Sequence, residues 1–372
     1  MISIVEAITK KQLLGFVKFP MSLYKNHPFW VPPLINDELE TFDKTKNPVF
    51  LNADAHFYLA YKNNQIVGRI CAIINWDEVK NQQKPKVRFG WWDVIDDVEV
   101  TQLLLEKVVE FGKNNNLSNI EGPMGFSNLD KVGAITQGFD EIGSMITWYN
   151  YPYYATHLQQ LGYSIEKQFV ENKFPFENVK LEFFEKAQEI IKKRYQVSEL
   201  NFTKTKDILP YVDKMFDLFN TSYANLSSFV AITDSQKEFF KKKYISFINP
   251  EFIKFVIDKD KNLIAFSIVM PSFSEALQKA KGKLFPFGLY HLLQARKYPK
   301  TVLFYLIGVH PDYQNKGVHA ILFKENHTTF TQKGILNCIR TPELADNLAI
   351  QLLWKNFKPQ VFRKRCTFIK YF

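Results

Sequence analysis

The sequence carries one pattern of β-rich runs twice, and this repeat limits the folds that the chain can adopt. Residues 57–62 and 66–74 are two such runs with a short polar turn between them, a pattern typical of a β-hairpin. Residues 253–258 and 263–270 have the same pattern, again with a polar turn. The sequence therefore predicts one β-hairpin in each half of the chain.

Each predicted hairpin is followed by a similar succession of elements. We expect strands at 88–94, 119–121, 302–309 and 336–340, and helices at 98–115, 317–333 and 343–356. Gly68 and Ala265 follow the two turns 197 residues apart (265 − 68), and Tyr163 and Phe357 close the halves 194 residues apart (357 − 163). Two pairs at nearly the same offset indicate an internal duplication of about 170–200 residues.

The length of 372 residues and the repeat together predict two domains. We expect a first domain at 1–166, a connection at 167–200 and a second domain at 201–372. The connection contains a charged helical pattern at 181–195, so we expect a linker helix there.

The loop after the predicted strand 302–309 is the most informative part of the sequence. Pro311 blocks further strand pairing because it lacks a backbone donor, and Gln314-Asn-Lys-Gly317 then leads into a helix. The unpaired amides and the dipole of a helix N-terminus favour a bound anion. Gly317 permits close approach of the backbone, and Lys316 adds a positive charge. This loop is therefore predicted to bind a phosphate-bearing ligand.

Two groups of residues in the second half resemble motifs of the GNAT acyltransferase superfamily. Val309, Pro311 and residues 314–317 look like motif A, Val-x-Pro-x-x-(Gln/Arg)-x-x-Gly-x-(Gly/Ala). A later group resembles motif B: Glu343, Asn347, Ile350 and Phe357. The resemblance covers roughly residues 200–372. It implies an α+β fold of two tandem GNAT-like domains, each a central mixed, mostly antiparallel sheet flanked by helices.

The resemblance also implies a co-substrate, acyl-CoA or acetyl-CoA. In the superfamily the loop amides bind the pyrophosphate of coenzyme A, and the preceding strand splays from its neighbour and hydrogen-bonds the pantetheine. An Asn of the following helix commonly contacts the cofactor. The residues of this chain expected in these roles are Ile307, Val309, Gln314, Asn315, Lys316, Gly317, Val318, His319 and Asn347.

Two residues depart from the family pattern. His319 stands where Gly or Ala is usual, so its imidazole would crowd the pyrophosphate, bond a phosphate or face solvent. Trp354 stands near the place of the Tyr that often serves as general acid, and an indole cannot protonate a leaving thiolate. This second departure puts the acid in doubt, and with it the activity.

The first half differs at the equivalent loop. Only Ile95-Asp96-Asp97 separates its predicted strand from its helix, without a glycine, and the two carboxylates stand at the helix N-terminus as caps. They would repel a pyrophosphate. We therefore expect residues 1–165 to form a GNAT-like domain that does not bind coenzyme A in the usual place.

The whole chain further resembles a bacterial group of tandem GNAT-like proteins, some of whose members are linked to acyl transfer onto sphingoid bases. The stretches that carry this resemblance are residues 27–34, 122–128, 137–141, 149–154 and 282–288. Two of them, 122–128 and 149–154, are loops rich in Gly, Pro, Asn and aromatic residues. Such loops either line an acceptor pocket or serve as turns with aromatic packing. If they bind the acceptor, Asn128, Tyr149 and Tyr153 are the candidates.

Two further segments each allow two interpretations. Residues 284–297 either pack on the sheet as a helix or present an apolar face to a lipid chain or a membrane. Residues 355–372 hold six Lys or Arg and no acid. This basic end is either a solvated edge strand or a contact for a phosphate or an anionic surface.

Charge and cysteine content narrow the classes of partner. The net charge of +10 favours an anionic partner, although no nucleic-acid-binding motif occurs, so we expect no nucleic acid. Three widely spaced cysteines and scattered histidines indicate neither a disulfide framework nor a metal site. Residues 1–24 lack the pattern of a signal peptide, and no apolar run is long enough to span a bilayer. We expect a cytoplasmic protein, with peripheral contact to an anionic membrane as an option.

The leading hypothesis is an acyl-CoA-dependent N-acyltransferase that passes its acyl group to a small-molecule or lipid amine in the cleft between the domains. Glu343 and Asp346 are candidate bases for the amine, and Tyr305 or Tyr313 could donate a proton to the thiolate. One alternative is a non-catalytic protein that binds coenzyme A or another ligand with the same fold. The other is a transferase for a lipid amine similar to a sphingoid base.

Overall fold

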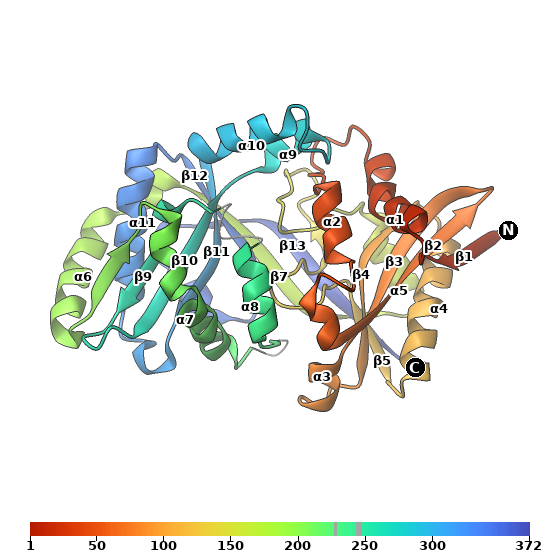
Figure 1. Cartoon of the computed structure of the whole chain (residues 1–372), viewed down its shortest axis with the longest axis horizontal. Coiled ribbons are helices and arrows are strands. Elements are labelled where there is room, and N and C mark those ends of the chain that lie inside the picture. Colours follow the sequence, from red (N-terminus) through yellow and green to blue (C-terminus); the bar gives the residue numbers. More distant parts are fainter. Residues whose placement is uncertain (227–228, 243–247) are drawn as a thin grey trace.

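One mixed sheet runs through both halves of the protein (Figure 1). The computed structural model describes residues 1–226, 229–242 and 248–372. The sheet has 13 strands in the order β1-β2-β3-β4-β5-β13-β7-β12-β11-β10-β9-β8, and β6 pairs with β13 beside this path. This arrangement is the α+β fold with a mixed sheet and flanking helices that the sequence predicts.

The first half places one hairpin and one long helix on its part of the sheet. Its strands are β1 (Ile2–Glu6), β2 (Ala53–Lys62), β3 (Gln65–Asn75), β4 (Lys86–Val94), β5 (Asn119–Gly122), β6 (Ala134–Gln137) and β7 (Ser164–Pro175). Its helices are α1 (Lys10–Leu23), α2 (Ile35–Thr41), α3 (Trp76–Lys80), α4 (Val98–Asn114) and α5 (Tyr153–Gln160). The predicted hairpin is confirmed as β2 and β3, and the predicted helix as α4.

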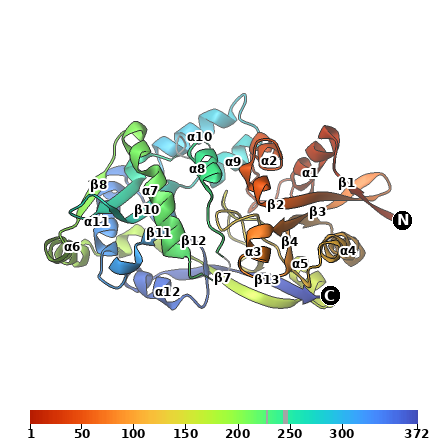
Figure 2. The same cartoon turned by 60° about the horizontal axis from the view of Figure 1, so that its bottom comes forward.

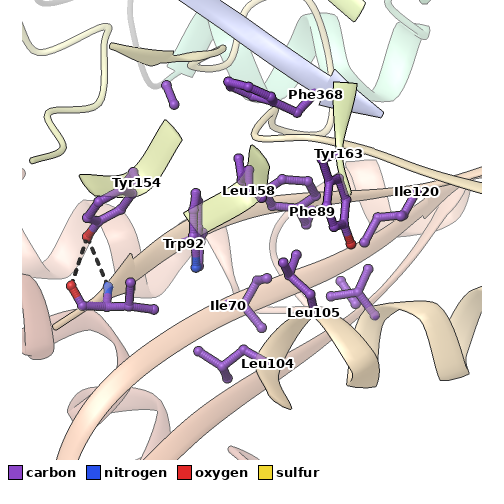
Figure 3. Packing of buried hydrophobic residues seen from close by; sticks show 14 of the residues in the cluster. Ile70, Phe89, Trp92, Leu104, Leu105, Ile120, Tyr154, Leu158, Tyr163 and Phe368 are labelled. Carbon is purple, nitrogen blue, oxygen red and sulfur yellow. Dashed lines mark hydrogen bonds between the residues drawn. The ribbon is translucent and has the colours of Figure 1, made fainter. Parts of the chain in front are cut away.

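The core of the first half follows from the apolar stripe of α4. Val100, Leu104 and Val108 are completely buried and face the sheet. Figure 3 shows Leu104 beside Ile70 of β3, with aromatic side chains from β4 and α5 filling the space above them. The sequence period of α4 therefore determines which face of the helix packs on the sheet.

The second half has a similar hairpin, β9 and β10, and a long helix, α11. Its strands are β8 (Ser198–Asn201), β9 (Ile253–Ile257), β10 (Leu263–Pro271), β11 (Thr301–Val309), β12 (Asn337–Leu344) and β13 (Gln360–Tyr371). Its helices are α6 (Leu181–Tyr195), α7 (Thr205–Tyr223), α8 (Asp234–Phe240), α9 (Ser274–Ala280), α10 (Gly288–Lys297), α11 (His319–Lys333) and α12 (Leu348–Trp354). The predicted helix at 181–195 is confirmed as α6, which packs against α11.

The last strands of the two halves exchange places. β13, the end of the chain, pairs with β5 of the first half, while β7 pairs with β12 of the second half. β7 and β13 also pair with each other along most of their length. Residues 164–175 are therefore part of the shared sheet, and the division at residues 166 and 200 stays a prediction.

The exchange corrects the interpretation of the basic C-terminal end as a solvated edge strand. β13 lies inside the sheet, where Arg363 and Arg365 are buried and both pair with Glu171 of β7. Arg365 also donates to the carbonyl oxygen of Trp148 over 2.7 Å. Opposite charge on β7 and backbone carbonyls compensate the buried guanidinium groups. The sequence of β13 alone does not contain these partners.

The predicted helix at 343–356 is wrong in its first turn. β12 continues to Leu344, where Glu343 pairs in register with Val170 of β7, and α12 begins only at Leu348. Pairing with a strand from the other half overrides the helical pattern here.

Helices α9 and α10 of the second half reach across to the first half, along one edge of the molecule in both views (Figure 1 and Figure 2). The Ser274 hydroxyl donates to the Gly143 carbonyl oxygen over 2.8 Å, and the Gln278 amide donates to the carbonyl oxygens of Pro28 and Trp30. Among the described residues, no helix combines the length and the apolar character that crossing a bilayer requires.

Candidate functional site

The loop between β11 and α11 has the backbone geometry of an anion cradle. A short 3-10 turn at Pro311–Tyr313 ends β11, and Asn315 and Gly317 then take positive φ angles of 60° and 76°. The Gln314 side-chain amide donates to the Val309 carbonyl oxygen over 3.1 Å and so fixes the loop to its strand. A Cβ at residue 317 would lie 3.0 Å from the Ile191 side chain, so the position suits glycine in conformation and in space.

Four backbone amides at the start of α11 are unpaired. Within the described part of the chain, the N–H groups of Asn315, Gly317, Val318 and His319 have no hydrogen-bond acceptor, and no side chain caps the helix. Unpaired amides and the positive end of a 15-residue helix favour an anion at this place. A phosphate site at this loop remains a prediction, and these amides are the groups that would bind the anion.

Lys316 supplies the positive charge of the loop. Its ammonium group lies 5.3 Å from the ring centre of Tyr195 and 5.2 Å from that of Tyr313, while the side chain remains exposed. The two rings hold the charge beside the unpaired amides. Since Tyr195 belongs to α6, this helix contributes one of the two rings beside Lys316.

His319 packs along its own helix. Its ring centre lies 5.8 Å from that of Phe323, one turn further on, and the side chain is half-buried. Burial lowers the pKa of the imidazole, so the ring is neutral at pH 7. His319 therefore adds no charge to the loop.

β11 and β12 separate next to this loop. Their parallel pairing covers only Thr301–Phe304 against Asn337–Arg340, whereas β11 pairs with β10 as far as Val309. Ile307 and Val309, the two strand residues expected at the cofactor, both lie on the part that has separated from β12. The Tyr223 hydroxyl of α7 donates to the Ile307 carbonyl oxygen over 3.0 Å, which occupies one polar group of this part.

The three candidate catalytic residues do not come together. Glu343 forms an ion pair with the buried Arg340, and Asp346 lies exposed in the turn before α12. Tyr305 is enclosed, and its hydroxyl donates to the Leu129 carbonyl oxygen over 3.3 Å. Burial raises the pKa of Tyr305, so the phenol remains protonated.

The two motif B positions have structural contacts. The Asn347 side-chain oxygen accepts from the Ile350 amide over 3.3 Å and so caps α12. Trp354 is 1% exposed and packs among aromatic residues, with the Arg340 guanidinium 4.9 Å from its ring centre.

The three candidate acceptor residues also bond within the protein. Asn128 accepts from the Val230 amide over 2.9 Å, and the Tyr149 hydroxyl donates to the Phe139 carbonyl oxygen over 3.0 Å. The Tyr153 hydroxyl donates to the Val94 carbonyl oxygen over 2.7 Å. Each candidate therefore stabilises a loop or helix end, which matches the turn-and-packing interpretation of these segments.

The equivalent region of the first half is closed by side chains. Asp97 caps α4 through the Glu99 amide and pairs with Lys62, and the Asp96 carboxylate lies 3.1 Å from the His157 ring nitrogen. Tyr154 accepts from the Val94 amide at the end of β4 over 2.9 Å. These contacts occupy polar groups at the end of β4 and the start of α4, and the absence of coenzyme A from the first half remains a prediction.

The first half contains a polar cavity that the sequence did not predict. It is partly open, has room for about one water molecule, and is bordered by the ion pair between Arg69 and Asp93 and by Glu38 and Lys131. Within the described residues, the Lys131 ammonium and the Glu38 carboxylate have no hydrogen-bond partner. Burial lowers the pKa of Lys131, which raises its neutral fraction.

One sequence signal could have indicated this cavity. Arg69 interrupts the apolar run of β3, and a charge inside a buried strand requires a partner. The partner Asp93 follows two tryptophans in β4. The sequence around Glu38 and Lys131 contains no comparable signal. Only the fold brings these two residues near the ion pair of Arg69 and Asp93.

Comparison with known proteins agrees with this fold. No protein-family model matches the chain. It is 28% identical over 323 residues to protein YghO of Escherichia coli K12, covering 85% of this chain and 80% of that protein. It is 23% identical over 321 residues to a bacterial ceramide synthase of Caulobacter vibrioides, covering 84% and 82%.

Among solved structures, the chain resembles a tandem GNAT protein from the clavulanic acid biosynthesis pathway, solved without acetyl-CoA. The TM-score is 0.59 at 9% sequence identity, with 100% of this chain and 98% of that chain covered. The chain therefore has the fold of a tandem GNAT protein.

Proposed function

We propose that the protein is an N-acyltransferase that takes its acyl group from coenzyme A bound at the loop between β11 and α11. The observation that carries this proposal is the set of four unpaired amides of Asn315, Gly317, Val318 and His319 at the start of α11. They lie directly after the part of β11 that has separated from β12. A phosphate site followed by an open strand edge suits a long ligand with a pyrophosphate and an amide-bearing arm.

The residues present fit coenzyme A. The amides and Lys316 would hold the pyrophosphate, Gly317 would keep its surroundings free of a side chain, and Ile307 and Val309 would offer backbone groups to the pantetheine. When bound, coenzyme A supplies an activated acyl thioester. The residues of this chain have to orient that thioester, keep water away and remove a proton from the amine.

The polar cavity of the first half, which has room for about one water-sized group, is our candidate site for the amino group of the acceptor. The loop that carries Lys131 also carries Leu129, whose carbonyl oxygen accepts from Tyr305 of β11, so the cavity and the open edge of β11 are joined by a short segment. Glu38 can bind an ammonium group, and Lys131, with its lowered pKa, can accept the proton that the amine must lose. Glu343 is a weaker candidate base because Arg340 already neutralises it.

A long-chain amine is the acceptor class that we favour. The relative named bacterial ceramide synthase covers most of this chain, and a ceramide is the amide of a long-chain base. By contrast, the buried Trp354 and the engaged Tyr305 hydroxyl favour a protein that binds coenzyme A without catalysis.

Thermal unfolding of the full chain with coenzyme A, acetyl-, octanoyl- and palmitoyl-CoA tests the donor site. A ligand at one hundred times its Kd stabilises the native state by about 2.7 kcal/mol, so the unfolding temperature must rise. We expect Lys316→Glu to raise the Kd of the ligand at least tenfold, so that the same ligand concentration stabilises the variant less. Lys259→Glu, in the exposed turn after β9, is the matched control and should bind as the wild type does.

Release of free thiol from the stabilising donor, with and without a long-chain amine, separates the two functions. Amine-dependent release supports transfer. Stabilisation without any release, across short and long amines, would support the non-catalytic protein. No stabilisation by any of the four ligands would refute the coenzyme A site itself.

A further inference from the structure

We propose that the α9–α10 surface, formed by the exposed side chains of residues 279–300, docks the protein onto an anionic lipid membrane. This inference rests on the surface alone and does not depend on the proposed function.

The first observation is a concentration of exposed apolar side chains. Six large ones lie within residues 285–298: Phe285, Phe287, Leu289, Tyr290, Leu293 and Tyr298. Phe285 and Phe287 are 73% and 70% exposed. Transfer of apolar side chains from water to an apolar environment is favourable. A cluster of exposed apolar side chains on a protein surface therefore marks an interaction site.

The second observation is that α10 has two distinct faces. Leu292 and Ala295 face inward and pack against α9 and the segment around Val31. Leu289 and Leu293, spaced by four residues, lie with Tyr290 on the outer face. The helix is therefore fixed to the protein by one stripe and presents a second apolar stripe outward, as an interfacial helix does.

The third observation is the charge around this face. Residues 276–300 contain six cations and no Asp or Glu: Lys279, Lys281, Lys283, Arg296, Lys297 and Lys300. All of these except Arg296 are exposed. A cationic rim around aromatic and leucine side chains complements an anionic lipid surface, where lysines meet head groups and the rings enter the interface.

The place of the surface suits a flat partner. α9 and α10 lie along one edge of the molecule in both views, with the connection between them projecting outward (Figure 1 and Figure 2). α9 is bonded to the first half through Gln278 and Ser274, so the helix pair is held rigidly at this edge. A flat bilayer can therefore meet the rings and the lysines together.

Co-sedimentation of the full chain with lipid vesicles tests the proposal. We expect binding to vesicles of phosphatidylcholine and phosphatidylglycerol at two to one, and at least tenfold weaker binding to pure phosphatidylcholine. Phe287→Ser/Leu293→Ser and Lys281→Glu/Lys283→Glu should each reduce the partition coefficient on anionic vesicles at least tenfold. Added salt should weaken binding, because screening reduces the attraction of the lysines.

Two double variants are matched controls. Ile190→Ser/Leu209→Ser removes two exposed apolar side chains of α6 and α7, and Lys10→Glu/Lys11→Glu reverses two exposed charges of α1. Both should bind anionic vesicles as the wild type does. Unfolding temperatures of all variants identify any that fail to fold.

Three results would overturn the proposal. One is no binding of the wild type to anionic vesicles. Another is equal loss of binding in a control variant, which would mean that charge or apolar content in general is responsible. The third is a dimer in light scattering that Phe287→Ser/Leu293→Ser dissociates, since the surface would then be an interface between two copies of the chain.

Discussion

The hydroxyl oxygen of Tyr154 accepts a hydrogen bond from the backbone amide of Val94 over 2.9 Å (Figure 3). Val94 ends β4, which corresponds to the end of β11 at Val309 in the second half. In the first half, the Tyr154 side chain thus bonds to the backbone at the end of the strand. In the second half, we propose that the corresponding backbone binds coenzyme A. Among the described residues, the loop after β11 keeps unpaired amides, whereas Tyr154 occupies the amide at the end of β4.

Replacing Tyr154 by Phe should destabilise the first half. The Val94 amide would lose its acceptor in a fully buried place, at a cost of about 1–3 kcal/mol. Urea unfolding measures this difference. Tyr371→Phe, at an exposed position, is the control and should change stability by less than about 0.5 kcal/mol. Equal stabilities of Tyr154→Phe and wild type would contradict the assigned bond.

Replacing Glu171 by Gln should weaken the exchanged strands. Arg363 and Arg365 would remain buried without their carboxylate, and removing one partner of a buried ion pair costs about 3–5 kcal/mol. Denaturant unfolding should show this loss, together with faster amide exchange in β7 and β13. Glu182→Gln, on the exposed side of α6, serves as the control.

The protein should lose stability in acid through Glu78. Burial alone would raise the pKa of this carboxyl, but Arg88 and Lys86 outweigh burial and hold the pKa at about 2. An unfolded Glu has a pKa of about 4.3, so Glu78 contributes stability above that pH, and the contribution disappears as the pH falls towards 2.

The Glu78 contribution is of the order of 3 kcal/mol, at about 1.4 kcal/mol for each pKa unit. Unfolding free energies between pH 6 and pH 2 measure it. Glu78→Gln should flatten this pH dependence, whereas Glu106→Gln, on the exposed side of α4, should leave it unchanged.

Gly317→Ala should affect both stability and the binding of coenzyme A. A side chain at a φ of 76° is strained by about 1 kcal/mol, and its Cβ would meet Ile191. Gly334→Ala has similar strain at a φ of 65°, but it stands at the other end of α11. Both variants should lose stability, and Gly317→Ala should lose more because of the contact with Ile191. Calorimetry should show weaker binding of coenzyme A for Gly317→Ala alone. Equal affinities of the two variants would argue against the loop as the site.

Lys131→Met should abolish most of the transferase activity that we propose. A positioned proton acceptor contributes about 10²–10⁴-fold, so kcat should fall by that factor while coenzyme A still stabilises the protein. Lys131→Arg should not restore activity, because a guanidinium remains protonated. The rate of the wild type should rise with pH through the lowered pKa of Lys131, and this limb should be missing in the variants. A variant with unchanged kcat would remove Lys131 from the mechanism.

Local patterns predicted much of the fold. The alternation in residues 57–74 and 253–270 predicted both hairpins, and the helical period predicted α4, α6 and α11 with close to their observed ends. The loop at Gln314–Gly317 was predicted because its glycine, its lysine and its place before a helix depend only on neighbours in the sequence. The helix over 343–356 failed at Glu343 because a strand from the other half pairs there.

By itself the sequence determined one hairpin in each half, the helices α4, α6 and α11, and one loop with a glycine and a lysine before a helix. These features depend on residues within a few positions of one another, where spacing and backbone preference decide the outcome. Only the tertiary structure decided that β7 and β13 change places, that Arg363 and Arg365 are buried beside Glu171, and that Lys131 shares a cavity with Glu38. Such contacts join residues far apart in the chain, and their energy comes from burial and pairing that no local pattern contains.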